Sequence, residues 1–312
     1  MGRVILVTGS SRGIGAAVAE HLAQKGDSVI INYIRNREKA AEVVHKLKAG
    51  GMESEYMQCD VSDKSAVQRM IGDIISRYGR IDVLVNNAGI LFQNYLLQAK
   101  ETDYAQLMNT NLMGAVYCSE EVLPHMKKTG YGKIINISSV SVLCPLVGSA
   151  LYALSKAMLN QYTLHTAYRF RDCNITVNAV ISGFVETDMA AEYRAYERLM
   201  TTASYPCIYG TADSVAEGVA LFANDAHGFI TGQLLTVDGG YSLQTEEQSG
   251  DSTPEKDGYL IMLIERHELY VTLLNGTATK ATAAICLTDS KEAGMQNENG
   301  AFFSQNEKSR YD

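Results

Sequence analysis

The chain of 312 residues lacks long hydrophobic runs. A membrane-spanning helix needs about 18 or more consecutive apolar residues, and because no such run occurs, the sequence predicts no membrane span. The opening residues, MGRVILVTGS, also lack the apolar stretch and cleavage site of a secretory signal. They are typical of a first buried strand, so we expect a cytoplasmic protein.

Cysteine is sparse, and positive charge is not in excess. The six cysteines lie far apart along the chain, at Cys59, Cys118, Cys144, Cys173, Cys207 and Cys286. This dispersal argues against a zinc site and a disulfide framework, so we expect reduced thiols and no metal. The net charge of −8 argues against nucleic-acid binding. Residues 243–312 hold 12 of the 35 acidic residues but only 6 of the 27 basic ones, so the acidity belongs mainly to the C-terminal end.

From residue 3 to about residue 240, short runs of Val, Ile and Leu alternate with helical patterns. Strands with continuous apolar runs are buried on both faces, and intervening helices imply parallel crossovers. The sequence therefore predicts an α/β, doubly wound, Rossmann-type fold. Its sheet is mostly parallel and seven-stranded, with helices on both faces. The ligand of such a fold lies beyond the carboxyl ends of the strands.

We expect one domain over residues 1–242, a polar linker over 243–258 and a C-terminal extension over 259–312. Residues 259–274 and 279–287 predict either a hairpin around the Asn-Gly-Thr at 275–277 or an amphipathic helix and a strand. The extension is too short to hold much core alone. We expect it to pack on the domain or on a partner subunit, or to be partly disordered.

The segment TGSSRGIG follows the first strand and opens the first helix. Glycines allow a tight turn and the close approach of a pyrophosphate, and a helix N-terminus offers free N–H groups. The glycine spacing differs from the general dinucleotide fingerprint, so a merely tight turn is the alternative. Its place at the first strand–helix junction favours a dinucleotide. The candidate contacts are Gly9, Ser10, Ser11, Arg12, Gly13, Ile14 and Gly15.

No carboxylate follows the second strand, where an NAD site usually has Asp or Glu for the ribose 2′-hydroxyl. The segment instead offers Tyr33, Arg35 and Arg37, and Arg12 adds a third cation. Guanidinium groups match a 2′-phosphate. We therefore predict NADP(H), held by Tyr33 and Arg35; the alternative is that Arg35 and Arg37 are solvated surface residues.

Polar residues follow the third and fourth strands. Asp60, with Val61 beside it, is a candidate for the adenine amine, although a cap or turn is the alternative. NNAG, at 86–89, allows close approach to a cofactor. Asn111 interrupts an otherwise apolar helix predicted over 104–128, so it should have a specific partner. The candidate cofactor contacts here are Asp60, Val61, Asn87, Ala88 and Gly89.

Tyr152 and Lys156 lie four residues apart in YALSK, on one face of a predicted helix. Alone, this pair also occurs by chance on surface helices. Taken in order, TGSSRGIG, NNAG, Asn111, ISS ending at Ser139, YALSK, GFVETDM and ITGQLLTVDGG resemble the short-chain dehydrogenase/reductase family over residues 3–242. Within that family the chain is most similar to 3-oxoacyl-[acyl carrier protein] reductases and related tailoring reductases.

The resemblance implies a catalytic tetrad of Asn111, Ser139, Tyr152 and Lys156. Tyr152 would give a proton to a substrate carbonyl oxygen that Ser139 also binds. Lys156 would lower the pKa of Tyr152 and, with Tyr152, contact the nicotinamide ribose. Asn111 would anchor a water. Ser138 is the rival of Ser139, and the family spacing to the tyrosine selects Ser139.

The chain departs from the family pattern in the loop after the sixth strand. Ser182 stands where a proline usually precedes Gly183, and a proline would stiffen the backbone. We expect a looser loop, with Gly183, Val185 and Thr187 still placed to hold the nicotinamide carboxamide. Residues 186–210 predict a substrate lid, with the candidate lining residues Met189, Tyr193, Tyr196, Met200 and Tyr205.

Carrier-protein docking is the second departure. The resemblance implies basic residues near the active-site mouth, where this chain has Thr129 or Gly130 and Cys173. Four neighbouring cations are candidates to substitute for them: Lys127, Lys128, Arg169 and Arg171. The resemblance also implies a homotetramer paired through the long helix that carries Tyr152. An acyl carrier protein is therefore an open alternative to a free thioester.

These observations predict an NADPH-dependent reductase. It would convert a ketone, such as a 3-oxoacyl thioester or related carbonyl compound, to a secondary alcohol, with Tyr152 as general acid. Two alternatives are a non-catalytic dinucleotide-binding regulator and an epimerase or dehydratase on the same fold. The complete tetrad argues against the regulator, because a sensor does not need these side chains together.

Overall fold

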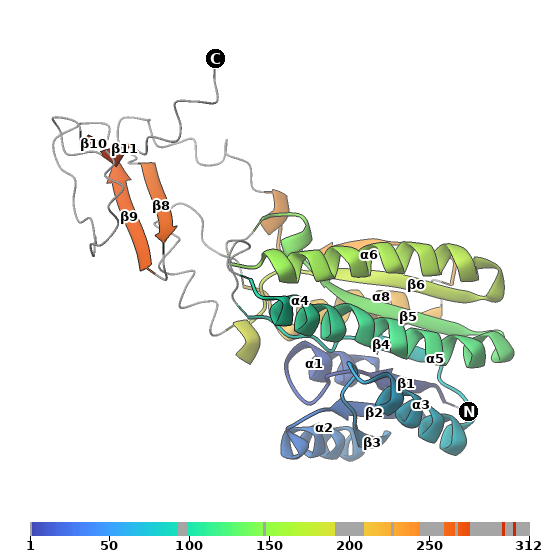
Figure 1. The fold of residues 1–312 in the computed structure, drawn as a ribbon. Coiled ribbons are helices and arrows are strands. Elements are labelled where there is room, and N and C mark those ends of the chain that lie inside the picture. The colour runs from blue at the N-terminus through green and yellow to red at the C-terminus, as the bar shows by residue number, and fades with distance from the viewer. Residues whose placement is uncertain are drawn as a thin grey trace. The chain divides into compact units, whose positions relative to one another are not determined.

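The computed structural model describes residues 2–92, 99–145, 148–190, 209–225 and 228–243, and the backbone of four short strands between 259 and 303. The chain divides into two units, Met1–Leu243 and Gln244–Asp312 (Figure 1). Among the described helices, none is long and apolar enough to cross a membrane.

The first unit is built on one parallel sheet. Its seven strands lie in the order β3-β2-β1-β4-β5-β6-β7, and every neighbouring pair is parallel. The strands are β1 (Val4–Val7), β2 (Ser28–Tyr33), β3 (Glu53–Gln58), β4 (Val83–Asn86), β5 (Gly132–Ser139), β6 (Ile175–Ser182) and β7 (Leu234–Val237). The predicted fold class is therefore confirmed. The strand order reverses between β1 and β4, which is where such sheets bind ligands.

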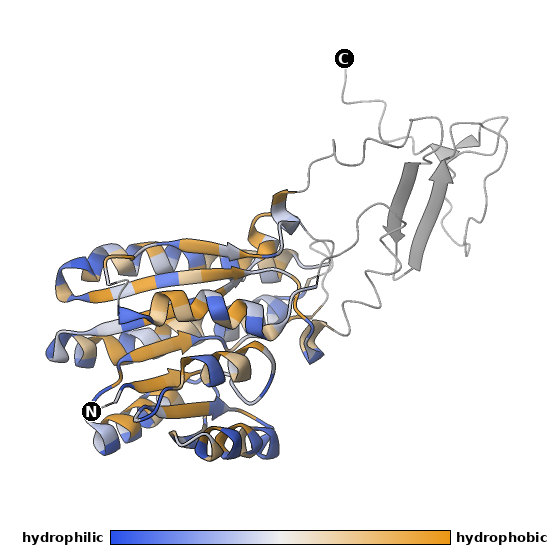
Figure 2. Cartoon of the chain, turned by 180° about the vertical axis from the view of Figure 1, so that it is seen from behind, coloured by the Kyte–Doolittle hydropathy of each residue, from blue (hydrophilic) through white to orange (hydrophobic). Residues whose placement is uncertain are grey.

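Helices cover both faces of this sheet (Figure 1). One face carries α1 (Gly13–Leu22), α2 (Arg37–Ala49) and α8 (Ala212–Ala223), and the other carries α3 (Lys64–Tyr78), α5 (Gly114–Thr129) and α6 (Ala150–Phe170). Successive side chains of a strand point to opposite faces. Ile5 and Val7 accordingly join the first core, and Val4 and Leu6 join the second. Figure 2 shows the resulting hydrophobic strands between amphipathic helices.

The ends of these helices carry the expected signals. The Asp63 side chain accepts hydrogen bonds from Ser65 N (2.8 Å) and Ala66 N (3.2 Å) and so caps α3, and Gly79 ends it with a φ of 75°. The Asn36 side chain accepts from Lys39 N at 2.9 Å and begins α2. These caps fix short loops at the carboxyl edge of the sheet, where the candidate residues gather.

The second unit contains two antiparallel strand pairs. β8 (Tyr259–Glu265) pairs with β9 (Glu268–Leu274), and β10 (Met295–Gln296) pairs with β11 (Phe302–Phe303). β8 and β9 keep seven residue pairs in register, so residues 259–274 hold two antiparallel strands, where we expected one strand or an amphipathic helix. The predicted turn at 275–277, the linker beyond Leu243 and the segment 279–287 lie outside the described residues.

Candidate active site

The glycine loop turns from β1 into α1 through left-handed backbone conformations. Gly9 has a φ of 62° and Gly13 a φ of 57°, which glycine adopts without strain. Arg12 precedes the helix, and no side chain caps the first turn of α1. The free N–H groups of that turn form the kind of site that binds an anion.

The loop that follows β4 is hydrogen-bonded to the glycine loop. Asn87 Nδ2 donates to Thr8 O (2.8 Å) and Gly9 O (3.1 Å), while the N–H groups of Asn87 and Ala88 donate to Thr8 Oγ1, both at 3.0 Å. A Cβ on Gly9 would lie 2.8 Å from Ala88 Cα, and one on Gly15 would lie 2.5 Å from Asn87 Nδ2. The sequence interpretation assigned the glycines to a pyrophosphate. The structure adds that two of them are required by this contact between loops.

Ser10 differs from its predicted role. Its side chain is fully buried, Oγ donates to Val7 O at 2.6 Å, and it accepts from Asn32 N at 3.2 Å. Asn32 in turn accepts from Gly9 N at 3.0 Å. Ser10 therefore stabilises the turn from inside and is not one of the residues that line the cavity.

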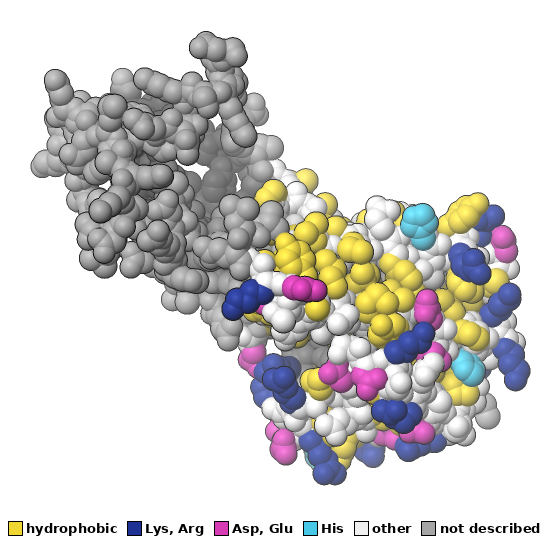
Figure 3. Space-filling view, in the orientation of Figure 1, with side chains coloured by type: hydrophobic (Ala, Val, Ile, Leu, Met, Phe, Trp, Pro, Cys, Tyr) yellow, Lys and Arg dark blue, Asp and Glu magenta, His cyan; other side chains and the backbone are white. Residues whose placement is uncertain are grey.

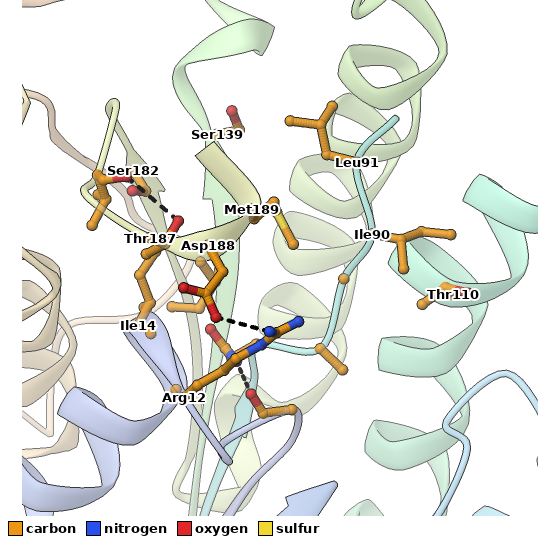
Figure 4. Close-up of a pocket in the computed structure, with 18 of the residues that line it drawn as sticks. Arg12, Ile14, Ile90, Leu91, Thr110, Ser139, Ser182, Thr187, Asp188 and Met189 are labelled. Carbon is orange, nitrogen blue, oxygen red and sulfur yellow. Dashed lines mark hydrogen bonds and ion pairs between the residues drawn. The ribbon is translucent and has the colours of Figure 1, made fainter. Parts of the chain in front are cut away.

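A cavity of about 1080 Å³ opens at the carboxyl edge of the sheet (Figure 4). This volume is at the upper end of what ligand sites offer, which suits a ligand as large as a dinucleotide. Most predicted site residues line it: Gly9, Ser11, Arg12, Gly13, Ile14, Gly15, Tyr33, Arg35, Asp60, Val61, Asn87, Ala88, Gly89, Ser139, Tyr152, Lys156, Gly183, Val185 and Thr187. The residues present therefore fit a dinucleotide.

The cations after β2 take different directions. Arg35 is exposed and lines the cavity, whereas Arg37 points away and donates to the Tyr56 hydroxyl at 3.1 Å. Arg37 is thus the surface residue that the alternative reading allowed. Lys39, in the first turn of α2, also lines the cavity. The sequence interpretation missed Lys39, although its place in the first helical turn after the second strand was the available signal.

Asp188 lies between two of the cavity's cations. Its Oδ2 is 2.8 Å from Arg12 Nη1 and 3.1 Å from Lys39 Nζ, and Figure 4 shows the Arg12 contact. The hydrogen bond and charge of Lys39, with the charge of Arg12, hold the pKa of the Asp188 carboxyl below its ordinary value. A carboxylate thus occupies the place between cations that a phosphate would prefer.

Asp60 and Val61 form the next part of the wall. Asp60 Oδ1 accepts from Ser62 N (2.9 Å) and Ser62 Oγ (2.7 Å), which is the turn that the alternative reading proposed. Val61 is buried beneath Gly114, where a Cβ would lie 2.7 Å from Val61 Cγ2. The turn holds both residues at the cavity wall.

Asn111 lies in a turn of π-helix. The single helix predicted over 104–128 is instead α4 (Glu101–Met108), a π turn (Asn109–Met113) and α5. Such turns widen a helix and often occur at functional sites. Asn111 is buried; its Nδ2 donates to Ile90 O (3.0 Å) and Ser155 Oγ (3.1 Å), and its Oδ1 accepts from Ile90 N (2.8 Å). The predicted specific partners exist, and they join the loop after Gly89 to α6.

Lys156 lies one helical turn after Tyr152 on α6. It is buried, and its Nζ donates to Ile137 O at 2.8 Å and lies 5.8 Å from the centre of the Tyr152 ring. Burial lowers the pKa of Lys156 to about 8, because a charged ammonium loses its hydration there.

Burial raises the pKa of Tyr152, and a hydrogen-bonding interaction with Ser139 opposes the rise. The lowering of this pKa that we expected from Lys156 together with an oxidised nicotinamide stays a prediction. Ser138 points to the other face of β5, where its Oγ is buried without a hydrogen-bond partner. Ser139 is therefore the serine at Tyr152.

The loop after β6 is held at both of its ends. The strand continues through Ser182, which pairs with both Ser139 and Val237, and the Ser182 hydroxyl donates to Gly183 O at 3.0 Å. A Cβ on Gly183 would lie 2.6 Å from Asp238 Cα. Beyond it, Met189 is exposed at the cavity (Figure 4). The other predicted lid residues, Tyr193, Tyr196, Met200 and Tyr205, lie outside the described residues.

The four cations considered for carrier docking are far from this cavity. Lys127 and Lys128 end α5, which leads into the first residue of β5, whereas Ser139 is the last residue of β5. At about 3.3 Å per residue, the eight residues of the strand separate these ends by roughly 25 Å. Arg169 and Arg171 similarly precede β6. The expectation that they lie near the mouth of the same chain's cavity is wrong.

Comparisons with known proteins agree with this geometry. A family model described as short chain dehydrogenase matches residues 3–198. The chain is 39% identical over 242 residues to the 3-oxoacyl-[acyl-carrier-protein] reductase FabG of Staphylococcus aureus, which covers 77% of this chain and 98% of that protein. It is 38% identical over 239 residues to the 3-oxoacyl-[acyl-carrier-protein] reductase of Synechocystis sp., covering 76% and 96% of the two chains.

Two solved structures are also similar. A mutant short-chain dehydrogenase/reductase of Serratia marcescens has a TM-score of 0.70 and 33% identity, covering 78% of this chain and 98% of that one. ElxO with NADP bound has a TM-score of 0.70 and 34% identity, covering 78% and 100%. The family model spans six of the seven strands, the residues that line the cavity and the Tyr152–Lys156 helix, and each of these relatives covers at least three quarters of the chain. The chain therefore belongs to the short-chain dehydrogenase/reductase family and is a nicotinamide-dinucleotide-dependent oxidoreductase acting on CH–OH and C=O groups.

Proposed function

We propose that the protein catalyses the NADPH-dependent reduction of a ketone, a 3-oxoacyl thioester or related carbonyl compound, to a secondary alcohol. One observation carries this proposal: Ser139, Tyr152 and buried Lys156 line the same dinucleotide-sized cavity, with Lys156 Nζ 5.8 Å from the centre of the Tyr152 ring. The two relatives named above as 3-oxoacyl-[acyl-carrier-protein] reductases support the substrate class.

Each side chain has a distinct task in the proposed reaction. The Ser139 hydroxyl donates to the carbonyl oxygen as negative charge develops there, and Tyr152 transfers its proton to the same oxygen. Lys156 carries positive charge below about pH 8 and would hold the ribose hydroxyls. Asn111 keeps the adjoining loop against α6. When bound, NADPH supplies the hydride.

The preference for NADPH rests on charge. Arg12, Arg35 and Lys39 line one end of the cavity, and Tyr33 stands where an NAD site usually has a carboxylate. The glycine loop and the free N–H groups of α1 would take the pyrophosphate. Asp60 and Val61 would contact the adenine, Asn87, Ala88 and Gly89 the ribose side, and Gly183, Val185 and Thr187 the carboxamide. The structure of ElxO with NADP bound supports this assignment.

The test is the consumption of NADPH and of NADH with a panel of ketones that includes an acetoacetyl thioester. Tyr152→Phe should lower kcat by about 10²- to 10⁴-fold, because the general acid is lost. Tyr168→Phe is the matched control, since Tyr168 lies on the same helix and is exposed. Wild-type rates in Tyr152→Phe would sink the proposal, and turnover with NADH alone would reject the cofactor assignment.

Subunit assembly is a separate expectation. Leu154 and Met158 are about half exposed, one turn apart on α6, and hydrophobic side chains gather on this face (Figure 3). This surface supports the homotetramer expected from the family resemblance. Sedimentation equilibrium should give about four times the chain mass of 34.1 kDa. A monomeric mass would contradict it.

A further inference from the structure

A serine that the proposed reaction does not use lies next to Ser139. Ser141 belongs to a short 3₁₀ turn, Val140–Val142, that directly follows β5. Its side chain is buried, and 5% of the residue's surface is exposed. A buried hydroxyl needs hydrogen-bond partners, and the partner of Ser141 is the Ser139 hydroxyl itself.

Two hydrogen bonds from Ser141 converge on one oxygen. Ser141 Oγ donates to Ser139 Oγ at 3.1 Å, and Ser141 N donates to the same atom at 3.2 Å. A serine hydroxyl has two acceptor lone pairs and one O–H. Because both lone pairs of Ser139 are occupied, its remaining capacity is to donate.

Ser139 lines the cavity together with Tyr152, so its remaining hydrogen can be donated to the reacting atoms. The interaction with Ser139 lowers the pKa of Tyr152, which is the effect of a donor to the phenolate. In reduction the same donor is needed at the carbonyl oxygen, where charge develops. Hydrogen bonds in a chain polarise one another, so donation by Ser141 strengthens donation by Ser139.

We propose that Ser141 is a positioning residue that fixes the Ser139 hydroxyl as a hydrogen-bond donor toward Tyr152 and the substrate carbonyl. The inference rests on the proposed function, because it concerns the same site. Without the Ser141 hydroxyl, Ser139 has a free lone pair and can rotate to accept a hydrogen bond. Ser139 would then stabilise the developing charge for only part of the time.

Few charged groups surround Ser139 and Tyr152. Lys156, one turn along α6, is the cation beside Tyr152, and within the described part of the chain no carboxylate contributes to the pKa shift of the phenol. A change in that pKa after substitution of Ser141 would therefore report on the hydrogen-bond chain, provided that Lys156 is unchanged.

The test compares Ser141→Ala, Ser141→Thr and Ser65→Ala in the full chain. Ser141→Ala should lower kcat about fivefold, the net worth of one hydrogen bond, with the KM for NADPH unchanged. Ser141→Thr keeps a hydroxyl and should restore most of the rate. Ser65→Ala removes an exposed hydroxyl on α3, away from the residues that line the cavity, and should leave kcat unchanged.

A second readout does not depend on turnover. In protein labelled with ¹³C-tyrosine, NMR titration follows the pKa of Tyr152, whose signal is identified by its loss in Tyr152→Phe. Ser141→Ala should raise this pKa, because the phenolate loses a polarised donor, whereas Ser65→Ala should not. A wild-type kcat and an unchanged Tyr152 pKa in Ser141→Ala would overturn the inference. Activity retained in Tyr152→Phe would instead reject the proposed function.

Discussion

The buried ammonium of Lys156 lowers the stability of the folded chain. Its ammonium is buried, and its pKa is lowered to about 8, so below that pH the folded chain holds a charge that has lost most of its hydration. Methionine has a similar shape and no charge. We expect Lys156→Met to abolish reduction but to raise the free energy of unfolding at pH 7 by on the order of 1 kcal/mol.

The pH dependence of this gain has a definite sign. The folded pKa of Lys156, about 8, lies below the unfolded value of about 10.4, so the unfolded chain binds more protons between those values. The free energy of unfolding of the wild type therefore rises with pH in this window, and its difference from that of Lys156→Met should shrink. Urea unfolding of both proteins at pH 7 and pH 9.5 measures this difference, with the exposed Lys127→Met as the control. A constant difference between the two pH values would contradict the prediction.

Some residues of the site could be predicted from sequence, and others could not. The Tyr152–Lys156 pair follows from helical spacing, and Ser139 from its distance along the chain to Tyr152. Ser10 was misjudged because its neighbours in sequence line the cavity while its own hydroxyl turns inward. Ser141 carried no signal, because the direction of its hydrogen bond depends on the 3₁₀ turn that places it.

At the level of elements, the glycine loop and the loop after β4 approach each other closely, and this approach can be tested. A Cβ on Gly15 would meet Asn87 Nδ2 at 2.5 Å and Gly9 O at 2.7 Å. Gly15→Ala should therefore separate the loops, lower stability by about 1–3 kcal/mol and weaken NADPH binding. Thermal unfolding and fluorescence titration measure these two effects.

Gly72→Ala is the matched control for Gly15→Ala. Gly72 is also inside a helix, and its Cβ would meet nothing within 4 Å. Alanine there should stabilise the chain by about 0.5–1 kcal/mol, because glycine costs helical stability. Equal effects of the two substitutions would show that the loops do not need their close approach.

The Arg12–Asp188–Lys39 contact links the glycine loop, α2 and the loop after β6. If NADPH is the cofactor, as we propose, Asp188 would compete with its 2′-phosphate for these two cations; the three side chains are largely exposed, so the ion pairs are weak. Asp188→Asn should tighten NADPH binding about two- to fivefold and leave NADH binding unchanged. Calorimetric titration of both cofactors measures this; equal changes for both would argue against competition at the 2′-phosphate.

The sequence predicted the strands of the first unit in their order, because most of them have continuous apolar runs, although β3, ESEYMQ, does not. It did not predict the helix α8, nor the π turn at Asn109–Met113, since one extra residue in a turn leaves the apolar pattern of the flanking helices in place. It also did not predict that residues 259–274 form two strands, although the polar residues at 265–268 were an available signal.

At the level of the whole molecule, the proposed catalytic and cofactor-binding residues all lie within residues 1–243. The first unit holds the three described hydrophobic clusters and the cavity, and the matched region spans 98% of the Staphylococcus aureus relative. We expect a chain truncated after Leu243 to fold, bind NADPH and keep kcat within about twofold of the full chain. Steady-state kinetics and thermal unfolding test this. Loss of turnover in a folded, truncated protein would assign a catalytic part to residues 244–312.

Near the end of the first unit, the Tyr241 ring meets the Phe184 ring edge-to-face, with centroids 5.0 Å apart, and Phe184 lines the cavity. The chain contains no tryptophan. Tyr241→Trp would therefore introduce a single indole whose emission comes from one known place. Because reduced nicotinamide absorbs where an indole emits, quenching of that light would reveal the arrival of the coenzyme in real time.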